Sequence, residues 1–166
     1  MAEALLVTRQ DVVKFTALNG NVDTDKFIQF VKIAQDTDLQ NYTGTKLLDK
    51  IKADIIANTL SGNYLTLTTT YLKPMLIHLA MKYYLPFAAY TISNKGVYKH
   101  NSENSTNVEK SEVDFLIEKE TQIAQHYTER FINYISFNNN LFPEYTANTN
   151  ADMFPDTNNN FTGWYI

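Results

Sequence analysis

The sequence predicts an all-α protein: a helical bundle of about five helices over residues 1–138, followed by a long extended C-terminal arm over residues 139–166. Through most of the first 138 residues, apolar side chains recur at three- and four-residue spacing, which is typical of helices that bury one face. Glycine, asparagine and proline separate these segments where helices start and stop. The last 28 residues lack this periodicity, although six of them are aromatic.

The first three helices are predicted from their capping and breaking residues. Thr8 can cap the first, Asp23 or Thr24 the second and Thr45 the third, because their side-chain oxygens can accept from free N–H groups. The expected ends are Asn19-Gly20, Gly44 and Ser61-Gly62-Asn63.

The fourth helix is predicted to start near Pro74, after a threonine-rich connector over residues 66–70. Proline fits the first turn of a helix, where its missing N–H has no partner to lose. The run from Met75 to Leu85 is apolar on nearly every side, so we expect it to be the central, buried helix. Pro86 should kink it before its end at Asn94-Lys95-Gly96. Lys82 argues against a membrane span, because a central lysine costs about 2.5–3.5 kcal/mol on insertion.

A polar loop over residues 97–110 follows, and loops of this length are often functional. Lys95, Lys99 and His100 therefore form a candidate partner-binding patch. The alternative is a solvated loop with no contact role.

The fifth helix is expected over residues 112–138, with Ser111 and Asp114 as a variant of the capping box. At about 1.5 Å per residue it would span about 40 Å. That is long for a domain of this size, so its exposed side is a candidate packing surface between copies.

The C-terminal arm is predicted to order on another subunit. Polar sequence interrupted by proline buries too little apolar surface to fold alone, yet a large aromatic side chain is worth about 1.5–3 kcal/mol once it enters a pocket. The predicted partner-binding residues are Phe142, Pro143, Tyr145, Phe154, Phe161, Trp164, Tyr165 and Ile166. The alternative is an arm that folds back over its own domain, with Trp164 capping the core.

Composition and charge argue against several classes of function. A net charge of −4 and an isoelectric point near 5.3 argue against a protein that grips nucleic acid, since phosphate binding needs clustered lysine and arginine. The absence of cysteine excludes disulfides and thiolate metal sites, and the N-terminus does not have the pattern of a signal peptide.

No constellation for catalysis stands out. His78, His100 and His126 fall in three separate elements, without the spacing of a helical metal site. We expect His78 to be a satisfied core residue, His126 a helix-surface residue, and Glu118, Glu120 and Glu129 a solvated helix face. Residues 156–160 match only the start of a calcium loop, and no glycine-rich phosphate loop is present. We therefore predict a protein that is not an enzyme, without catalytic residues, cofactor or metal.

Several motifs resemble the head-to-tail connector (adaptor, head-completion) proteins of tailed bacteriophages, especially those of phages of Bacteroidetes hosts such as the crAss-like phages. The resemblance covers nearly the whole chain and is carried by NGNVD at 19–23, AQD at 34–36, YTGTKL at 42–47, KPMLIH at 73–78, YLPFAAY at 84–90, NKGV at 94–97, SENS at 102–105, FPEY at 142–145 and FTGWY at 161–165.

This resemblance implies a ring, commonly of twelve copies, that docks on the portal protein and continues the channel through which double-stranded DNA leaves, without specific binding to it. The expected partners are then other copies, the portal and the next neck or tail ring, with no membrane. The expected location is the neck of the virion, assembled in the host cytoplasm. The alternatives are a tail-proximal neck or tail-completion protein, and an assembly or packaging accessory protein that is absent from virions.

Overall fold

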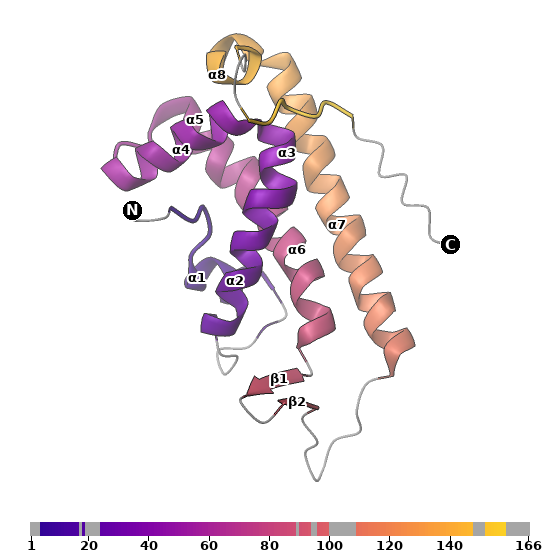
Figure 1. Ribbon diagram of the computed structural model, residues 1–166. Helices are drawn as coiled ribbons and strands as arrows, with labels where there is room; N and C mark the ends of the chain where they lie inside the picture. The colour runs from indigo at the N-terminus through magenta and orange to yellow at the C-terminus, as the bar shows by residue number, and fades with distance from the viewer. Residues whose placement is uncertain are drawn as a thin grey trace.

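The computed structural model describes residues 4–16, 18, 24–88, 90–93, 96–99, 109–147 and 152–158 (Figure 1). Most of these residues are helical, and the all-α prediction is confirmed. In Figure 1 the long helix α7 (Lys110–Phe137) runs beside α6 (Lys73–Tyr84), which also packs against α2 (Thr24–Ala34). The helices α4 (Thr45–Ala57), α5 (Gly62–Thr66) and α8 (Pro143–Thr146) lie at the upper end of this layer.

The first helix, α1 (Arg9–Phe15), begins at the N-cap Thr8 as predicted. The Thr8 hydroxyl accepts from the Asp11 N–H, and the Asp11 carboxylate accepts from the Thr8 N–H, which is a reciprocal capping box. The helix ends at Phe15, earlier than expected, and Asn19-Gly20 lies outside the described residues.

The second predicted helix is confirmed as one continuous segment: α2, a π-helical turn η1 (Gln35–Leu39) and α3 (Gln40–Thr43). The π turn accompanies a fully buried Gln35. Its amide donates to the Ala4 carbonyl at 3.0 Å and its amide oxygen accepts from the Leu6 N–H at 2.9 Å. A single side chain thus ties the N-terminal segment to the bundle. Gly44 ends α3 at a φ of 72°, a backbone conformation that favours glycine.

The predicted connector over residues 66–70 is wrong, because the chain is helical from Gly62 onward. The segment runs through α5, the π turn η2 (Leu67–Leu72) and α6 to the 3₁₀ turn η3 (Leu85–Phe87). Pro74 therefore lies inside a continuous helical segment. The wide π turn directly before it relieves the clash that a proline ring makes with the carbonyl four residues earlier. Burial of Leu67, Thr68 and Leu72 outweighs the weak helix propensity of the threonines.

The predicted extension of the fourth helix to Asn94-Lys95-Gly96 is also wrong. The α-helix ends at Tyr84, and Pro86 lies in the 3₁₀ turn that follows, since a proline cannot donate the next backbone hydrogen bond. The strands β1 (Tyr90–Ser93) and β2 (Gly96–Lys99) then pair antiparallel, with Tyr90 opposite Lys99 and Ser93 opposite Gly96. The central position of α6 is confirmed by its buried residues Met75, Leu76, Ile77, Leu79, Ala80 and Met81.

The fifth helix is confirmed as α7, although its capping box is formed by Glu109 and Glu112 rather than by Ser111 and Asp114. After α7 the chain does not leave the domain. A 3₁₀ turn, η4 (Asn139–Leu141), and α8 return it to the core, where Phe142 is fully buried. The described part of residues 139–166 therefore packs on the bundle, and the domain boundary expected after residue 138 falls inside the packed structure.

Candidate interaction surfaces

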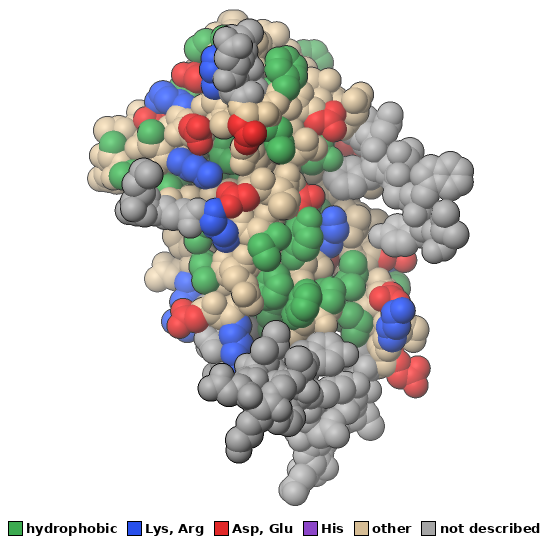
Figure 2. All heavy atoms as spheres, viewed as in Figure 1, with side chains coloured by type: hydrophobic (Ala, Val, Ile, Leu, Met, Phe, Trp, Pro, Cys, Tyr) green, Lys and Arg blue, Asp and Glu red, His purple; other side chains and the backbone are tan. Residues whose placement is uncertain are grey.

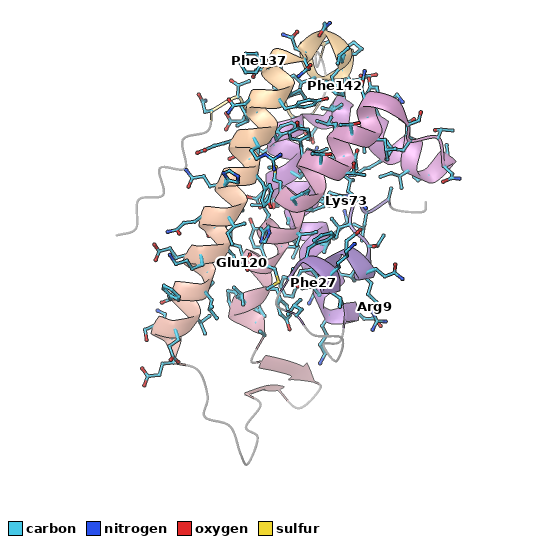
Figure 3. The ribbon with its side chains drawn as sticks, turned by 180° about the vertical axis from the view of Figure 1, so that it is seen from behind. Arg9, Phe27, Lys73, Glu120, Phe137 and Phe142 are labelled. Carbon is cyan, nitrogen blue, oxygen red and sulfur yellow. The ribbon has the colours of Figure 1, made fainter. Side chains whose placement is uncertain are left out.

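A cavity of about 280 Å³ lies between α1, α6 and α7. Its lining combines apolar side chains with one carboxylate, one ammonium group and one imidazole: Asp11, Phe15, Thr69, Lys73, Pro74, Ile77, His78 and Tyr127. Each charged or titratable group in this lining has a partner in the chain. Figure 3 labels Lys73 on α6, which pairs with Asp11 of α1, and Glu120 on α7, which pairs with His78 of α6.

Asp11 is the most heavily bonded of these groups. Its carboxylate accepts from the Lys73 ammonium at 3.0 Å and from the Thr8 hydroxyl at 2.9 Å, in addition to the Thr8 N–H. Burial alone raises the pKa of the Asp11 carboxyl. The bonds from Thr8 and the Lys73 charge outweigh that effect, so this pKa lies below its ordinary value of 3.8.

Asp11→Asn should lower the free energy of unfolding by about 1 kcal/mol, because it removes the negative charge that pairs with Lys73 and leaves only a neutral amide oxygen as the acceptor of the cap. Since the pKa of Asp11 is lowered on folding, its contribution is present above pH 3.8 and is lost as pH falls through the folded-state pKa. Urea denaturation should show the full difference from wild type at pH 7 and a smaller difference at pH 3. Asp49→Asn, at an exposed position of α4, is the matched control and should change neither value.

The second ion pair joins α6 to α7. His78 Nδ1 lies 2.7 Å from Glu120 Oε2, and both side chains are less than one-fifth exposed. The His78 ring stacks on the Tyr127 ring, with 5° between the planes. The Arg130 guanidinium lies over the rings of Tyr71 and Tyr127. The prediction for Glu120 is therefore wrong, because it holds two helices together instead of facing solvent. His126 is exposed, which confirms the prediction that it lies on the helix surface.

The C-terminal residues that were predicted to bind a partner divide into three groups. Phe142 and Tyr145 are buried in the bundle, where Phe142 meets Tyr64 and Tyr134 edge-on or tilted, so these two residues belong to the core and not to a partner surface. Pro143 and Phe154 are exposed, Phe154 to 66 %. Outside the described residues lie Phe161, Trp164, Tyr165 and Ile166.

Residues 152–158 form a strap across the junction of α3 and α4. The N-cap of α4 is Gly44, which has no side chain to offer, and the free Thr45 N–H donates instead to the Met153 carbonyl at 3.0 Å. The Met153 N–H donates back to the Thr45 hydroxyl at 2.9 Å, and the Asp156 N–H donates to the Asn41 carbonyl at 2.8 Å. The strap thus completes a helix end that the local sequence leaves open.

The strap also changes the electrostatics around Tyr42. Burial and then the carboxylates of Asp156 and Asp38 raise the pKa of Tyr42 to about 12. A raised pKa favours the protonated phenol in the folded state. Its contribution to stability is therefore complete below pH 10 and is lost as pH rises through about 12.

Of the predicted partner-binding patch, only Lys99 lies among the described residues. Lys95 and His100 lie outside the described residues, and Lys99 is the last residue of β2. The polar loop predicted over residues 97–110 begins as a strand, and residues 100–108 lie outside the described part of the chain.

An aromatic patch lies where α2 meets η3. Phe30 stacks on Phe87 with ring centroids 5.6 Å apart, and Phe87 is 54 % exposed. Ile33, one turn further along α2, is 42 % exposed. Figure 2 shows hydrophobic side chains gathered on this face, over the region between α2 and α7.

The first half of α7 forms a second apolar surface. No residue from Lys110 to Ile123 is fully buried, whereas the second half contributes Ala124, Thr128, Phe131, Ile132 and Ile135 to the core. Phe115 is 55 % exposed, Leu116 45 % and Ile123 40 %. Leu116 and Ile123 are seven residues apart, so they lie on the same side of α7. The neighbouring helix α6 leaves both of them exposed.

Two features are absent from the described residues. No group of three or more His, Asp or Glu side chains there is placed to hold a metal ion. No helix in the part of the chain that the structure describes has the length and apolar character needed to cross a membrane.

Comparison with known proteins gives one match. The model of a family of unknown function, DUF6712, matches residues 39–155, more than half of the chain. The matched region extends from the end of η1 to the strap and includes α6 and α7. No curated protein and no solved structure matches the chain.

Proposed function

We propose that this chain, which belongs to the DUF6712 family of unknown function, is a structural virion protein of a tailed bacteriophage. In this proposal it forms an oligomeric ring that docks on the portal protein, connects the head to the tail and continues the DNA channel. It is not an enzyme. The proposal rests on the resemblance of its motifs to phage head-to-tail connectors and on the surface of α7.

The observation that carries the proposal is the uncovered first half of α7. An isolated helical stretch is marginal in water, and most helical stability comes from packing of an apolar face. Phe115, Leu116 and Ile123 form such a face, yet each of them is at least 40 % exposed. Exposed apolar faces rimmed by polar residues are typical of interaction sites. Further copies of the chain would supply the cover that the single domain lacks.

Two other features support a ring on a DNA channel. The net charge of −4 repels phosphate, so DNA would pass without being held. The strap ends at the surface of the bundle at Asn158, and the aromatic residues Phe161, Trp164 and Tyr165 follow it in the sequence. These residues remain the proposed arm, which would bind a neighbouring copy or the portal.

The test is the mass of the purified protein, alone and with its cognate portal, measured by light scattering behind a sizing column. The expected result is a ring that forms alone or on the portal. A monomer that ignores the portal would reject the adaptor function and favour a later tail component. Absence of the protein from purified virions would favour a packaging or assembly accessory role.

A further inference from the structure

The first half of α7 combines its apolar residues with negative charge. From Glu109 to Lys119 the sequence has four carboxylates and two lysines. Glu112 and Glu118 come three residues before and three residues after Phe115, so all three share one side of the helix. A shallow hollow here is lined by Ser111, Glu112, Phe115 and Leu116. We call Glu112, Phe115, Leu116 and Glu118 the acidic edge.

The helix α1 presents the opposite charge. Arg9, Gln10, Val13 and Lys14 line another shallow hollow, which we call the basic edge. Arg9 and Lys14 are exposed, and neither forms an ion pair with any residue that the structure describes. The only carboxylate of α1, Asp11, is neutralised by Lys73. The basic edge therefore has two positive charges available to an outside group.

The two edges lie at opposite sides of the molecule. In Figure 3, Arg9 is at the right-hand rim and the first half of α7 at the left-hand rim, with α6 between them. Figure 1 shows the same separation from the front. A contact between the acidic edge of one copy and the basic edge of the next uses two different surfaces. Such a heterologous contact repeats around a ring when the rotation closes.

We propose that the acidic edge of one copy binds the basic edge of the next copy, and that this contact builds the ring of the proposed function, on which the inference rests. The aliphatic stems of Arg9 and Lys14 would cover Phe115 and Leu116, while their charged groups meet Glu112 and Glu118. The Arg9 guanidinium can also stack on the Phe115 ring.

The charges favour this pairing over a two-fold dimer. Two acidic edges facing one another would bring Glu112 and Glu118 against the same residues of the second copy, and like charges in an interface are repulsive. The Lys119 ammonium lies 5.3 Å from the centroid of the Phe115 ring, so this ring already faces a cation of its own helix. The basic edge of the next copy would add two further positive charges beside it.

The experiment reverses the charges of each edge separately and then of both edges together. The double variant Arg9→Glu/Lys14→Glu and the double variant Glu112→Lys/Glu118→Lys should each reduce assembly of the ring at least tenfold at low salt. The chain with all four substitutions should recover it, because every contact again joins opposite charges. Wild-type assembly should weaken as salt screens the contact. Assembly is measured by light scattering, alone or on the portal.

The controls separate folding from contact. Far-UV circular dichroism and thermal melts should show that all variants keep the helical fold, since the four side chains are exposed. Glu112→Lys also removes one bond of the α7 capping box, so the variants that carry it should melt slightly earlier than wild type. Asp49→Lys, a reversal at an exposed position of α4, should assemble as wild type does. Normal assembly of either double variant, or failure of the fourfold variant to recover, would overturn the contact while leaving the ring intact as a hypothesis. A monomeric wild type, with and without portal, would reject both.

Discussion

Phe142→Ala should lower the free energy of unfolding by about 3–5 kcal/mol, the loss typical of a fully buried phenylalanine. The Phe142 ring lies edge-on to Tyr64 at 5.4 Å and tilted against Tyr134 at 6.1 Å, and Tyr134 stacks on Tyr71 at 4.1 Å. Removal of the ring leaves a cavity at the meeting point of three helical segments. Urea denaturation followed by far-UV circular dichroism measures the loss.

Phe154→Ala is the matched control, because Phe142 and Phe154 are phenylalanines of the same C-terminal region. Phe154 is 66 % exposed, so its replacement should change the free energy of unfolding by less than about 0.5 kcal/mol. If Phe142→Ala abolishes folding outright, Phe142→Leu provides a milder comparison, with an expected loss of about 1–1.5 kcal/mol. Equal effects of the two alanine variants would contradict the assignment of Phe142 to the core.

A neighbouring contact anchors the same region through a polar group. The Tyr64 hydroxyl donates to Glu144 Oε2 at 2.5 Å, and burial together with this bond raises the pKa of Tyr64 above its ordinary value. The α8 residue Tyr145 packs edge-on against Phe131 of α7. A chain that ends at Asn138 would lose all of these contacts, so it is not expected to fold as an isolated helical domain.

The helices could be predicted from the sequence wherever local signals and burial agree. Three local signals predicted their elements correctly: the N-cap Thr8, the helix-ending Gly44 and the apolar run of α6. Each of these signals depends only on residues that are close together in the sequence. The connector at residues 66–70 was wrong for the opposite reason. Its threonines are weak helix formers, and only the tertiary burial of Leu67 and Leu72 makes the segment helical.

The C-terminal region shows a second limit. Its aromatic residues and its lack of hydrophobic periodicity fit both an arm that binds a partner and a segment that folds back on its own domain. The sequence alone does not decide between these two alternatives. The structure divides them residue by residue: Phe142 fills the core, whereas Phe154 faces outward. The strap depends on Met153 reaching Thr45, a contact across 108 residues, which no local pattern can indicate.

The ion pairs and the edges were missed for related reasons. Glu120 looks like a surface residue because it has charged and polar neighbours in sequence, but His78 lies 42 residues away and 2.7 Å from it in space. Leu116 and Ile123 could be assigned to the apolar side of α7 from their spacing. Whether α6 covers them depends on where α6 ends, and this helix ends at Tyr84, earlier than its sequence predicts.

The strap and the residues that follow it can be separated by two truncations. A chain that ends at Ala147 loses the Met153 carbonyl that caps Thr45, the bond from Asp156 to Asn41 and the buried Pro155. It should therefore lose about 2 kcal/mol of unfolding free energy. A chain that ends at Asn158 keeps all three contacts and should unfold as the full chain does.

The truncation at Asn158 tests the arm itself, because it removes Phe161, Trp164, Tyr165 and Ile166 without touching the strap. If these residues anchor in a neighbouring copy or in the portal, the shortened chain should fold normally and fail to assemble or dock, since buried aromatic anchors often contribute about 2 kcal/mol or more each. Trp164→Ala should give a partial form of the same defect. Light scattering reports assembly and urea denaturation reports folding. Normal assembly of the shortened chain would remove the arm from the proposed function, and a loss of stability in the isolated monomer would instead show that the segment folds back on its own domain.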